Sequence, residues 1–160
     1  MKYSRGFTLV ELMVTLAVAA IILGFAVPSF QALVENNRVT SEANRLLGAM
    51  QFARSEAVRL GETVSLSAVS NDFNNGWCVH RTANCTGSNI LRQFAAPASA
   101  FSSAAASVSF SARGERTPQA GGNIVISVQP TDCDVGEVAR RSTVTVGLSG
   151  LVRLTRGDCT

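Results

Sequence analysis

Hydrophobic residues follow three successive patterns along the 160-residue chain. From Phe7 to Pro28 the residues are almost all apolar, and Glu11 is the one charged residue among these 22 positions. Over residues 31–61 apolar side chains recur every three or four positions, and over residues 62–160 short stretches alternate apolar and polar side chains. These patterns predict, in this order, an apolar helix, an amphipathic continuation of that helix, and a β-rich domain.

The apolar segment, residues 7–30, has the length of a membrane-spanning helix. Twenty-two helical residues rise about 33 Å, close to the roughly 30 Å hydrocarbon core of a bilayer. Lys2 and Arg5 precede the segment, and positive residues tend to stay on the cytoplasmic side. We therefore expect one membrane pass, with the later residues in the periplasm or outside. A cleaved signal peptide fits poorly, because no small-x-small site closes the apolar run.

An apolar stripe continues the helix beyond this segment. Pro28 predicts a kink or a break, and its simplest interpretation is a mark of the membrane exit. The stripe has the spacing of one helix face: Ala43, Leu46, Met50, Ala53, Ala57 and Leu60. We expect a solvated face, or contact with neighbouring subunits, for Glu35, Arg38, Glu42, Arg45, Glu56 and Arg59. With Gly61 as C-cap, one helix from about Phe7 to Leu60 would be around 80 Å long if unbroken.

Six stretches after residue 62 have the alternation and β-branched residues of strands: TVSLSAV, GWCVHR, ILRQFA, SVSFSAR, NIVISVQ and RSTVTVGLSGLVRL. Turn-forming residues separate them, and no helical pattern alternates with them, so we expect an antiparallel sheet. The Ala- and Ser-rich residues 95–107 are expected to form a surface loop. The predicted fold is α+β: a long N-terminal helix, transmembrane in its first half, packed on an antiparallel β-sheet domain.

The residue inventory argues against an enzyme. The net charge is +3, and without Lys2 and Arg5 the 14 basic residues fall to 12 against 11 acidic ones. His80 is the one histidine, and it stands two residues from Cys78 on a predicted strand, so their shared face is a consequence of strand geometry. No nucleophile–base pair or metal-ligand cluster is visible, so we predict no catalytic residue, no cofactor and no metal.

The string Arg5-Gly6-Phe7-Thr8-Leu9-Val10-Glu11 resembles the class III signal of type IV pilins and type II secretion pseudopilins. The resemblance implies that a prepilin peptidase removes the leader, residues 1–6, by cutting between Gly6 and Phe7. It also implies that Phe7 becomes an N-methylated N-terminus, and that Glu11 becomes the fifth residue of the mature chain. Helices of this family often bend near the position of Pro28, which gives Pro28 a second interpretation, in assembly.

A carboxylate such as Glu11 inside an apolar span costs about 3 kcal/mol, so it should have a partner. It could extend toward the membrane interface, helped by the positive end of the helix. Alternatively it pairs with the α-amino group of Phe7, in its own chain or in the adjacent subunit. The family resemblance favours the pair, because a filament core leaves an amine and a carboxylate to neutralise each other.

The segment Ala53-Arg54-Ser55-Glu56-Ala57-Val58 is similar to that of the GspH/FimT/FimU group of minor pilins and pseudopilins. This resemblance implies a tip-proximal minor pilin that enters a type IV pilus and helps to prime its assembly. The implied partners are other major and minor pilins, the prepilin peptidase and an inner-membrane assembly platform. The implied location is the bacterial inner membrane, with residues 62–160 periplasmic, and then the filament. A secretion pseudopilin is the first alternative.

A DNA-binding minor pilin of a competence pilus is the second alternative. FimT-like members have a C-terminal GRxR-type motif, and here the stretch reads GLVRLTRG, with Leu151 in place of the first arginine. Arg153, Arg156, Arg140 and Arg141 are the candidate contacts. Residues 61–160 hold eight arginines against seven acidic residues, which is a weak electrostatic footprint for nucleic acid. DNA is therefore a partner that the sequence allows but does not favour.

Four cysteines allow three pairings into two disulfides, which suit a periplasmic domain. We favour Cys78–Cys85, which would close a hairpin-like loop, and Cys133–Cys159, which resembles the C-terminal disulfide loop of many pilins. A four-cysteine zinc site is the rival interpretation. The CxxC spacings of such sites are absent, and the expected compartment is oxidising.

Overall fold

The computed structural model describes residues 7–81, 85, 87–118 and 121–160, apart from the side chains of residues 25–29. The leader with Gly6 therefore lies outside the described residues. The chain divides into two compact units, Met1–Glu35 and Asn36–Thr160. A single helix, α1 (Leu9–Leu60), begins in the first unit and ends in the second.

The first unit consists of the first part of α1. Its large apolar side chains from Phe7 to Leu23 are between 50% and 75% exposed. The helix continues through Pro28, so the chain does not break there. Among the residues described, no helix has both the length and the apolar character of a membrane span.

Gly61 ends α1 as the sequence predicts. Its φ of +68° is the left-handed conformation of a helix C-cap, and its amide donates to the Ala57 carbonyl oxygen at 3.0 Å. The residues that follow extend into the first strand.

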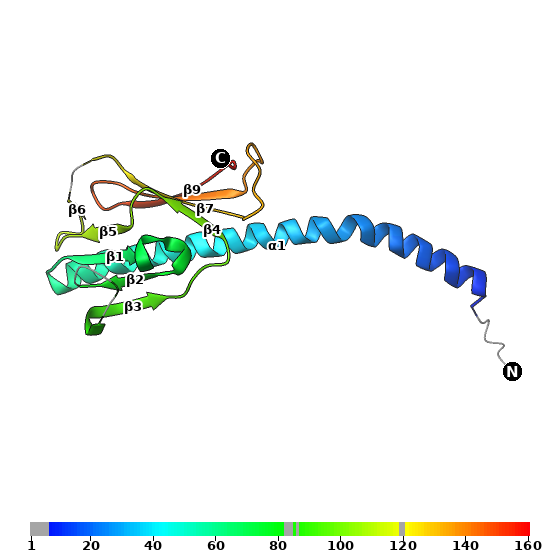
Figure 1. Cartoon of the computed structure of the whole chain (residues 1–160), viewed down its shortest axis with the longest axis horizontal. Helices are drawn as coiled ribbons and strands as arrows, with labels where there is room; N and C mark the ends of the chain where they lie inside the picture. Colours follow the sequence, from blue (N-terminus) through cyan, green and yellow to red (C-terminus); the bar gives the residue numbers. More distant parts are fainter. Residues whose placement is uncertain (1–6, 82–84, 86, 119–120) are drawn as a thin grey trace. The chain divides into compact units, whose positions relative to one another are not determined.

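The second unit contains two antiparallel sheets, where the sequence predicts one (Figure 1). The first has the order β3-β2-β1-β5-β6 and comprises β1 (Val64–Ala68), β2 (Trp77–His80), β3 (Ile90–Phe94), β5 (Ser107–Phe110) and β6 (Arg116–Thr117). The second has the order β4-β7-β8-β9 and comprises β4 (Ala100–Ser103), β7 (Ile124–Gln129), β8 (Arg141–Val146) and β9 (Val152–Gly157). Short 3-10 helices occur at Val69–Asn71, Phe73–Asn75 and Gly87–Asn89.

Strand β4 occupies Ala100–Ser103 inside residues 95–107, so the prediction of a loop is wrong for these four residues. Ala and Ser have little intrinsic preference for strands, but Phe101 pairs with Val128 of β7 and is 6% exposed. Burial of this one aromatic side chain against a neighbouring strand overrides the local composition.

The stripe on α1 forms the centre of the second unit. Side chains from Val39 to Ala57 on this face are 0–2% exposed, whereas Leu60 is only partly buried. They pack with residues of both sheets, among them Leu66, Trp77 and Val144. The second half of α1 runs alongside β1 and β2 in Figure 1. Four of the buried positions on this side of α1 are alanines, whose small side chains leave room for side chains of the strands: Ala43, Ala49, Ala53 and Ala57.

Glu42 and Arg45 of α1 correct the prediction of a solvated face, and together with Arg54 we call them the tethers. The Glu42 carboxylate is buried and accepts the amides of Ala98 at 2.8 Å and Ser99 at 3.0 Å. The Arg45 guanidinium donates to the Ala95 carbonyl at 3.2 Å and lies over the Trp77 ring, 5.1 Å from its centroid. The Ala95 carbonyl and the Ala98 and Ser99 amides lie in a loop and have no partner in a neighbouring strand. Side chains of α1 provide their hydrogen-bonding partners instead.

Arg54, the third tether, donates to the carbonyl oxygens of Gly114 at 2.8 Å and Ser149 at 3.4 Å. Gly114 lies in the β5–β6 turn and Ser149 in the β8–β9 turn, so one guanidinium joins the two sheets. Both turns are tight: a Cβ at Gly150, whose φ is +75°, would overlap the Gly114 carbonyl oxygen. Arg54 of the ARSEAV segment therefore has a structural role within this chain, because it holds one turn of each sheet.

Removal of the Glu42 carboxylate should destabilise the second unit. Glu42→Ala leaves two amides without their acceptor, and we expect the free energy of unfolding to fall by about 2 to 4 kcal/mol. Glu42→Gln keeps one acceptor oxygen and should lose less. Chemical denaturation of the full chain in detergent measures both, with Glu115→Ala, in an exposed pair with Arg113, as the control. Equal stability of Glu42→Ala and Glu115→Ala would contradict this role.

Candidate functional site

Helix α1 begins with a reciprocal pair of hydrogen bonds between Thr8 and Glu11. The Glu11 amide donates to Thr8 Oγ1 at 3.2 Å, and the Thr8 amide donates to Glu11 Oε2 at 3.1 Å. The Thr8 hydroxyl also donates to this carboxylate oxygen, at 3.0 Å. This is a capping box, which satisfies amides that the first turn of a helix leaves without acceptors. The T-x-x-E spacing signals it, and the sequence analysis missed that signal.

The capping box gives the Glu11 carboxylate a partner, Thr8, that the sequence analysis did not consider beside the membrane interface and the Phe7 amine. In the uncleaved chain the nitrogen of Phe7 is an amide, so the charge that Glu11 is expected to neutralise exists only after cleavage. The Glu11 carboxylate lies at the Thr8 amide, one residue from that nitrogen. The first turn therefore holds the carboxylate beside the position where a new N-terminus would arise.

At the other end of α1, Glu56 and Arg59 form an exposed pair one turn apart, with Arg59 Nε 3.1 Å from Glu56 Oε1. The hydrogen bonds from Arg59 hold the pKa of the Glu56 carboxyl below its ordinary value, and the same contact raises the pKa of Arg59. Arg59 matches the predicted solvated face, whereas the Glu56 side chain is only 15% exposed.

The four cysteines form the two disulfides that the sequence analysis favours. Cys78 is joined to Cys85 and Cys133 to Cys159, each with a Cα–Cα distance of 5.8 Å. His80 lies near the first disulfide and Glu137 near the second, within reach of a shared metal ion. A sulfur in a disulfide offers no thiolate to a metal, so these groups do not form zinc sites as they stand.

His80 is buried in β2, and its Nε2 lies 2.8 Å from Ser67 Oγ on the neighbouring strand β1. It is therefore a strand residue with a hydrogen-bonding partner, and it lies apart from the described pockets.

The structure does not gather the four arginines considered for nucleic acid. Arg140 makes ion pairs with Glu137 at 2.6 Å and Asp132 at 3.2 Å, which offset its charge. Arg141 bonds to Thr160, and Arg156 bonds to Thr40 on α1. Arg153 is exposed on β9 and lines one of the described pockets. A continuous basic surface from these four side chains is therefore absent.

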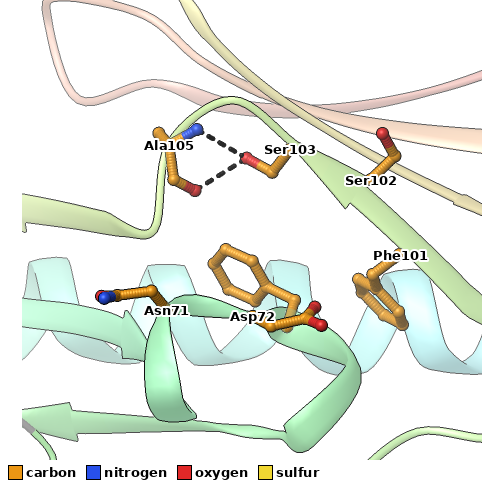
Figure 2. A pocket seen from close by; sticks show the side chains of 7 residues that line it. Asn71, Asp72, Phe101, Ser102, Ser103 and Ala105 are labelled. Atoms are coloured by element: carbon orange, nitrogen blue, oxygen red, sulfur yellow. Dashed lines mark hydrogen bonds between the residues drawn. The ribbon is translucent and has the colours of Figure 1, made fainter.

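Two of the pockets on the second unit are lined entirely by residues that the structure describes. One, of about 280 Å³, lies between β4 and the loop before β2 (Figure 2). Ser103 Oγ at its edge accepts from the Ala105 amide at 3.1 Å and donates to the Ala105 carbonyl at 2.8 Å. Asp72 accepts from the Asn74 amide at 2.9 Å. These polar groups therefore stabilise their own loops.

The other pocket, of about 370 Å³, lies at the β8–β9 turn and contains Arg153. Three of its seven lining residues carry hydroxyl groups: Thr145, Ser149 and Thr155. Neither pocket, as far as its lining is described, places a base beside a nucleophile.

Comparison with known sequences gives two family matches. Residues 42–150 match the family described as type II transport protein GspH, and residues 1–27 match the prokaryotic N-terminal methylation motif. The first match covers more than half of the chain and includes the tethers, the stripe and most of both sheets.

Individual relatives are similar over shorter stretches. Type II secretion system protein H of Pseudomonas aeruginosa is 41% identical over 58 residues, which are 36% of this chain and 34% of that protein. Fimbrial protein Q of Moraxella bovis is 29% identical over 91 residues, 57% of either chain. The chain thus aligns with about a third to somewhat over half of the length of these relatives.

The fold matches the crystal structure of the type IV minor pilin FimU of Pseudomonas aeruginosa. The TM-score is 0.64, over 77% of this chain and 92% of that one, at 19% sequence identity. At this identity the likeness establishes the architecture of a long N-terminal helix packed on antiparallel sheets.

Loss of the Cys133–Cys159 link should destabilise the fold. The link spans 26 residues, for which the loop-entropy relation gives about 3 kcal/mol of stabilisation. The double variant Cys133→Ser with Cys159→Ser avoids a free thiol and should unfold at a clearly lower temperature than the wild type. Peptide mapping under non-reducing conditions provides the control, since it should link Cys133 to Cys159 in the wild type. A Cys78–Cys159 peptide would contradict the pairing.

Proposed function

The chain belongs to the family of the type II transport protein GspH, and from this premise we propose that it enters a type IV pilus near the tip and helps to prime assembly. It is a minor pilin or pseudopilin of the type IV pilin family, a family of structural subunits. What we propose beyond the family is the kind of filament, a type IV pilus, and the position of the chain near its tip.

The observation that carries the proposal is the exposed apolar side of the first unit. Leu9, Leu16 and Ile22 are each at least 60% exposed, and the large apolar residues between them are at least 50% exposed. Contiguous apolar surface of this extent is unfavourable in water, and each such side chain contributes about 1.5 to 3 kcal/mol when it is buried. Lipid before assembly, and the helices of neighbouring subunits afterwards, are the environments that suit it.

We place residues 7–30 in the bacterial inner membrane before assembly, with the N-terminus cytoplasmic and the sheets periplasmic. The basic leader supports this orientation, and two disulfides suit an oxidising compartment. The partners in this scheme are the prepilin peptidase, the assembly platform, and other major and minor pilins. The match to the methylation motif supports the peptidase as a partner.

Glu11 has two successive roles in this proposal. In the uncleaved chain its carboxylate caps the helix through Thr8. After cleavage the same carboxylate lies one residue from the new amine of Phe7, or meets the amine of an adjacent subunit in the apolar core. Burial makes a lone charge costly there, so the pair would select subunits in correct register.

A pseudopilin of a type II secretion system is the second candidate, favoured by the similarity to type II secretion system protein H. Both candidates need the same processing and the same apolar helix. A DNA-receptor role receives less support, because the candidate arginines are separated and Arg140 is paired.

Processing can be tested by mass spectrometry of the membrane-extracted protein. We expect an N-terminus at Phe7 carrying one methyl group, because the Gly6–Phe7 junction follows a short basic leader. An intact Met1, or a cut after Pro28, would contradict the proposal.

The charge of Glu11 can be separated from its capping role. Glu11→Gln retains an acceptor for the Thr8 amide but removes the charge, whereas Glu11→Ala removes both. Both variants should be inserted and cleaved, and both should enter filaments about a hundredfold less often than wild type, because an amine would stay unpaired in the apolar core. Immunoblots of sheared filaments measure incorporation. Normal incorporation of Glu11→Gln would show that the charge is not required.

A further inference from the structure

Arginine side chains and aromatic rings alternate in one row of the second unit. The members of this cation–aromatic row are, in order of contact, Phe52, Arg92, Phe94, Arg45 and Trp77. The Arg92 guanidinium carbon lies 5.5 Å from the centroid of the Phe52 ring and 5.6 Å from that of Phe94. The Arg45 guanidinium carbon lies 5.5 Å from the Phe94 centroid and 5.1 Å from that of Trp77. Each guanidinium is therefore within cation–π distance of two rings.

The row joins α1 to the edge of the first sheet. Phe52 and Arg45 belong to α1, whereas Arg92 and Phe94 belong to β3, the terminal strand in the order β3-β2-β1-β5-β6. Trp77 is fully buried, the two phenylalanines are partly buried, and Arg92 is exposed. The row thus begins in the core and reaches the surface at Arg92.

The donors of Arg92 are unoccupied. Among the described residues Arg92 makes no hydrogen bond and no ion pair, whereas Arg45 donates to the Ala95 carbonyl. All 11 acidic residues belong to the described part of the chain, so no acidic side chain of the chain itself pairs with Arg92. The rings contact the faces of the guanidinium, and its N–H groups point outward in its plane. Arg92 therefore presents these N–H groups to a partner from outside the chain.

The carboxylates nearest to the row along α1 are already engaged. Glu42, three residues before Arg45, accepts two loop amides. Glu56, four residues after Phe52, is paired with Arg59. The positive charge of Arg92 is therefore not offset by the helix beside it.

A guanidinium held between two rings suits a carboxylate. Its planar fork can donate two parallel hydrogen bonds to the two carboxylate oxygens. The rings restrict the arginine side chain in advance, so binding costs less conformational entropy than at a freely moving arginine. Partly buried rings also lower the local dielectric constant, which strengthens a charge pair relative to one in open water.

Gly48 leaves room for a partner beside the row. It lies between Arg45 and Phe52 on the same side of α1, it is exposed, and a Cβ there would meet no described atom within 4 Å. Glycine inside a helix costs about 1 kcal/mol relative to alanine, and no close contact among the described residues requires it. A glycine at this position allows another polypeptide to approach the helix closely.

We propose that the cation–aromatic row receives an aspartate or glutamate side chain of a neighbouring pilin of another kind, which Arg92 binds through two N–H groups. This inference rests on the proposed function, because other pilins and not copies of this chain are the neighbours of a minor subunit. Arginine and aromatic side chains are also enriched among the residues that dominate binding energy in protein interfaces. A nucleic acid would use several phosphate contacts, and the row offers one unoccupied guanidinium.

The composition of the chain allows a direct test with a carbodiimide. Lys2 is the one lysine, and it lies in the leader, so the processed chain has no lysine amine. Arg92→Lys introduces an amine at the row. A carbodiimide joins this amine to a carboxylate in contact with it, forming an amide bond and taking up the released water to become a urea.

In sheared filaments, Arg92→Lys should give a cross-linked product in which position 92 is joined to an aspartate or glutamate of another pilin. Arg153→Lys is the matched control, because Arg153 is exposed and has no ion pair but contacts no aromatic ring among the described residues. It should give about tenfold less product. An amide to an acidic residue of the chain itself or of a second copy would overturn the proposal, and so would incorporation without any product at position 92.

Charge reversal tests whether the contact supports assembly. Arg92→Glu should lower filament incorporation about tenfold, and reversal to arginine of the partner's cross-linked residue should restore it. Arg113→Glu, at an exposed position outside the row, is the control and should be incorporated normally. Normal incorporation of Arg92→Glu, or a loss that the partner's reversal does not restore, would contradict the proposal. If thermal unfolding shows that Arg92→Glu does not fold, the cross-link of Arg92→Lys decides alone.

Filament incorporation of wild type separates this inference from the proposed function. If wild type enters filaments but position 92 gives no link to another pilin, the contact is wrong and the pilin proposal stands. If wild type does not enter filaments, the proposed function itself fails.

Discussion

The contact between the stripe on α1 and the two sheets is the interaction on which the rest of the second unit depends. Small alanine side chains along the stripe leave room for side chains of the strands, and Leu46 and Met50 belong to the same buried cluster as residues of both sheets. Neither sheet could bury its apolar face without the helix, because each is small and has open edges. The turns, the disulfide loops and both pockets are positioned by this packing.

The tethers show how a helix can organise loops as well as a core. Apolar packing is roughly proportional to buried area and has little directional preference. Hydrogen bonds from Glu42 and Arg54 to particular backbone groups are directional, so they select one arrangement of the loops over the stripe. Arg54 is central to this selection, since it joins a turn of each sheet.

The sequence predicts those features that depend on periodicity. The helix from about Phe7 to Leu60, its buried stripe and the Gly61 cap follow from spacing and local conformational preference, and the structure has all three. The sequence does not predict contacts between distant residues. Strand β4 exists because Phe101 meets Val128, and Glu42 is buried because two amides some 56 residues later need an acceptor. The four arginines are close in sequence, but the alternating faces of β9 and the ion pairs of Arg140 separate them.

A filament subunit needs contacts of two kinds, and the beginning of α1 offers both. The apolar side chains of the first unit offer large but non-directional stabilisation, so they favour association without defining a register. Register requires directional contacts, such as the Glu11 carboxylate on an amine in the core. An exposed charge pair contributes only about 0 to 1 kcal/mol, too little to drive assembly by itself. Inside a core that apolar contacts already hold together, the pair discriminates between registers, because a shift of one subunit leaves a buried charge without its partner.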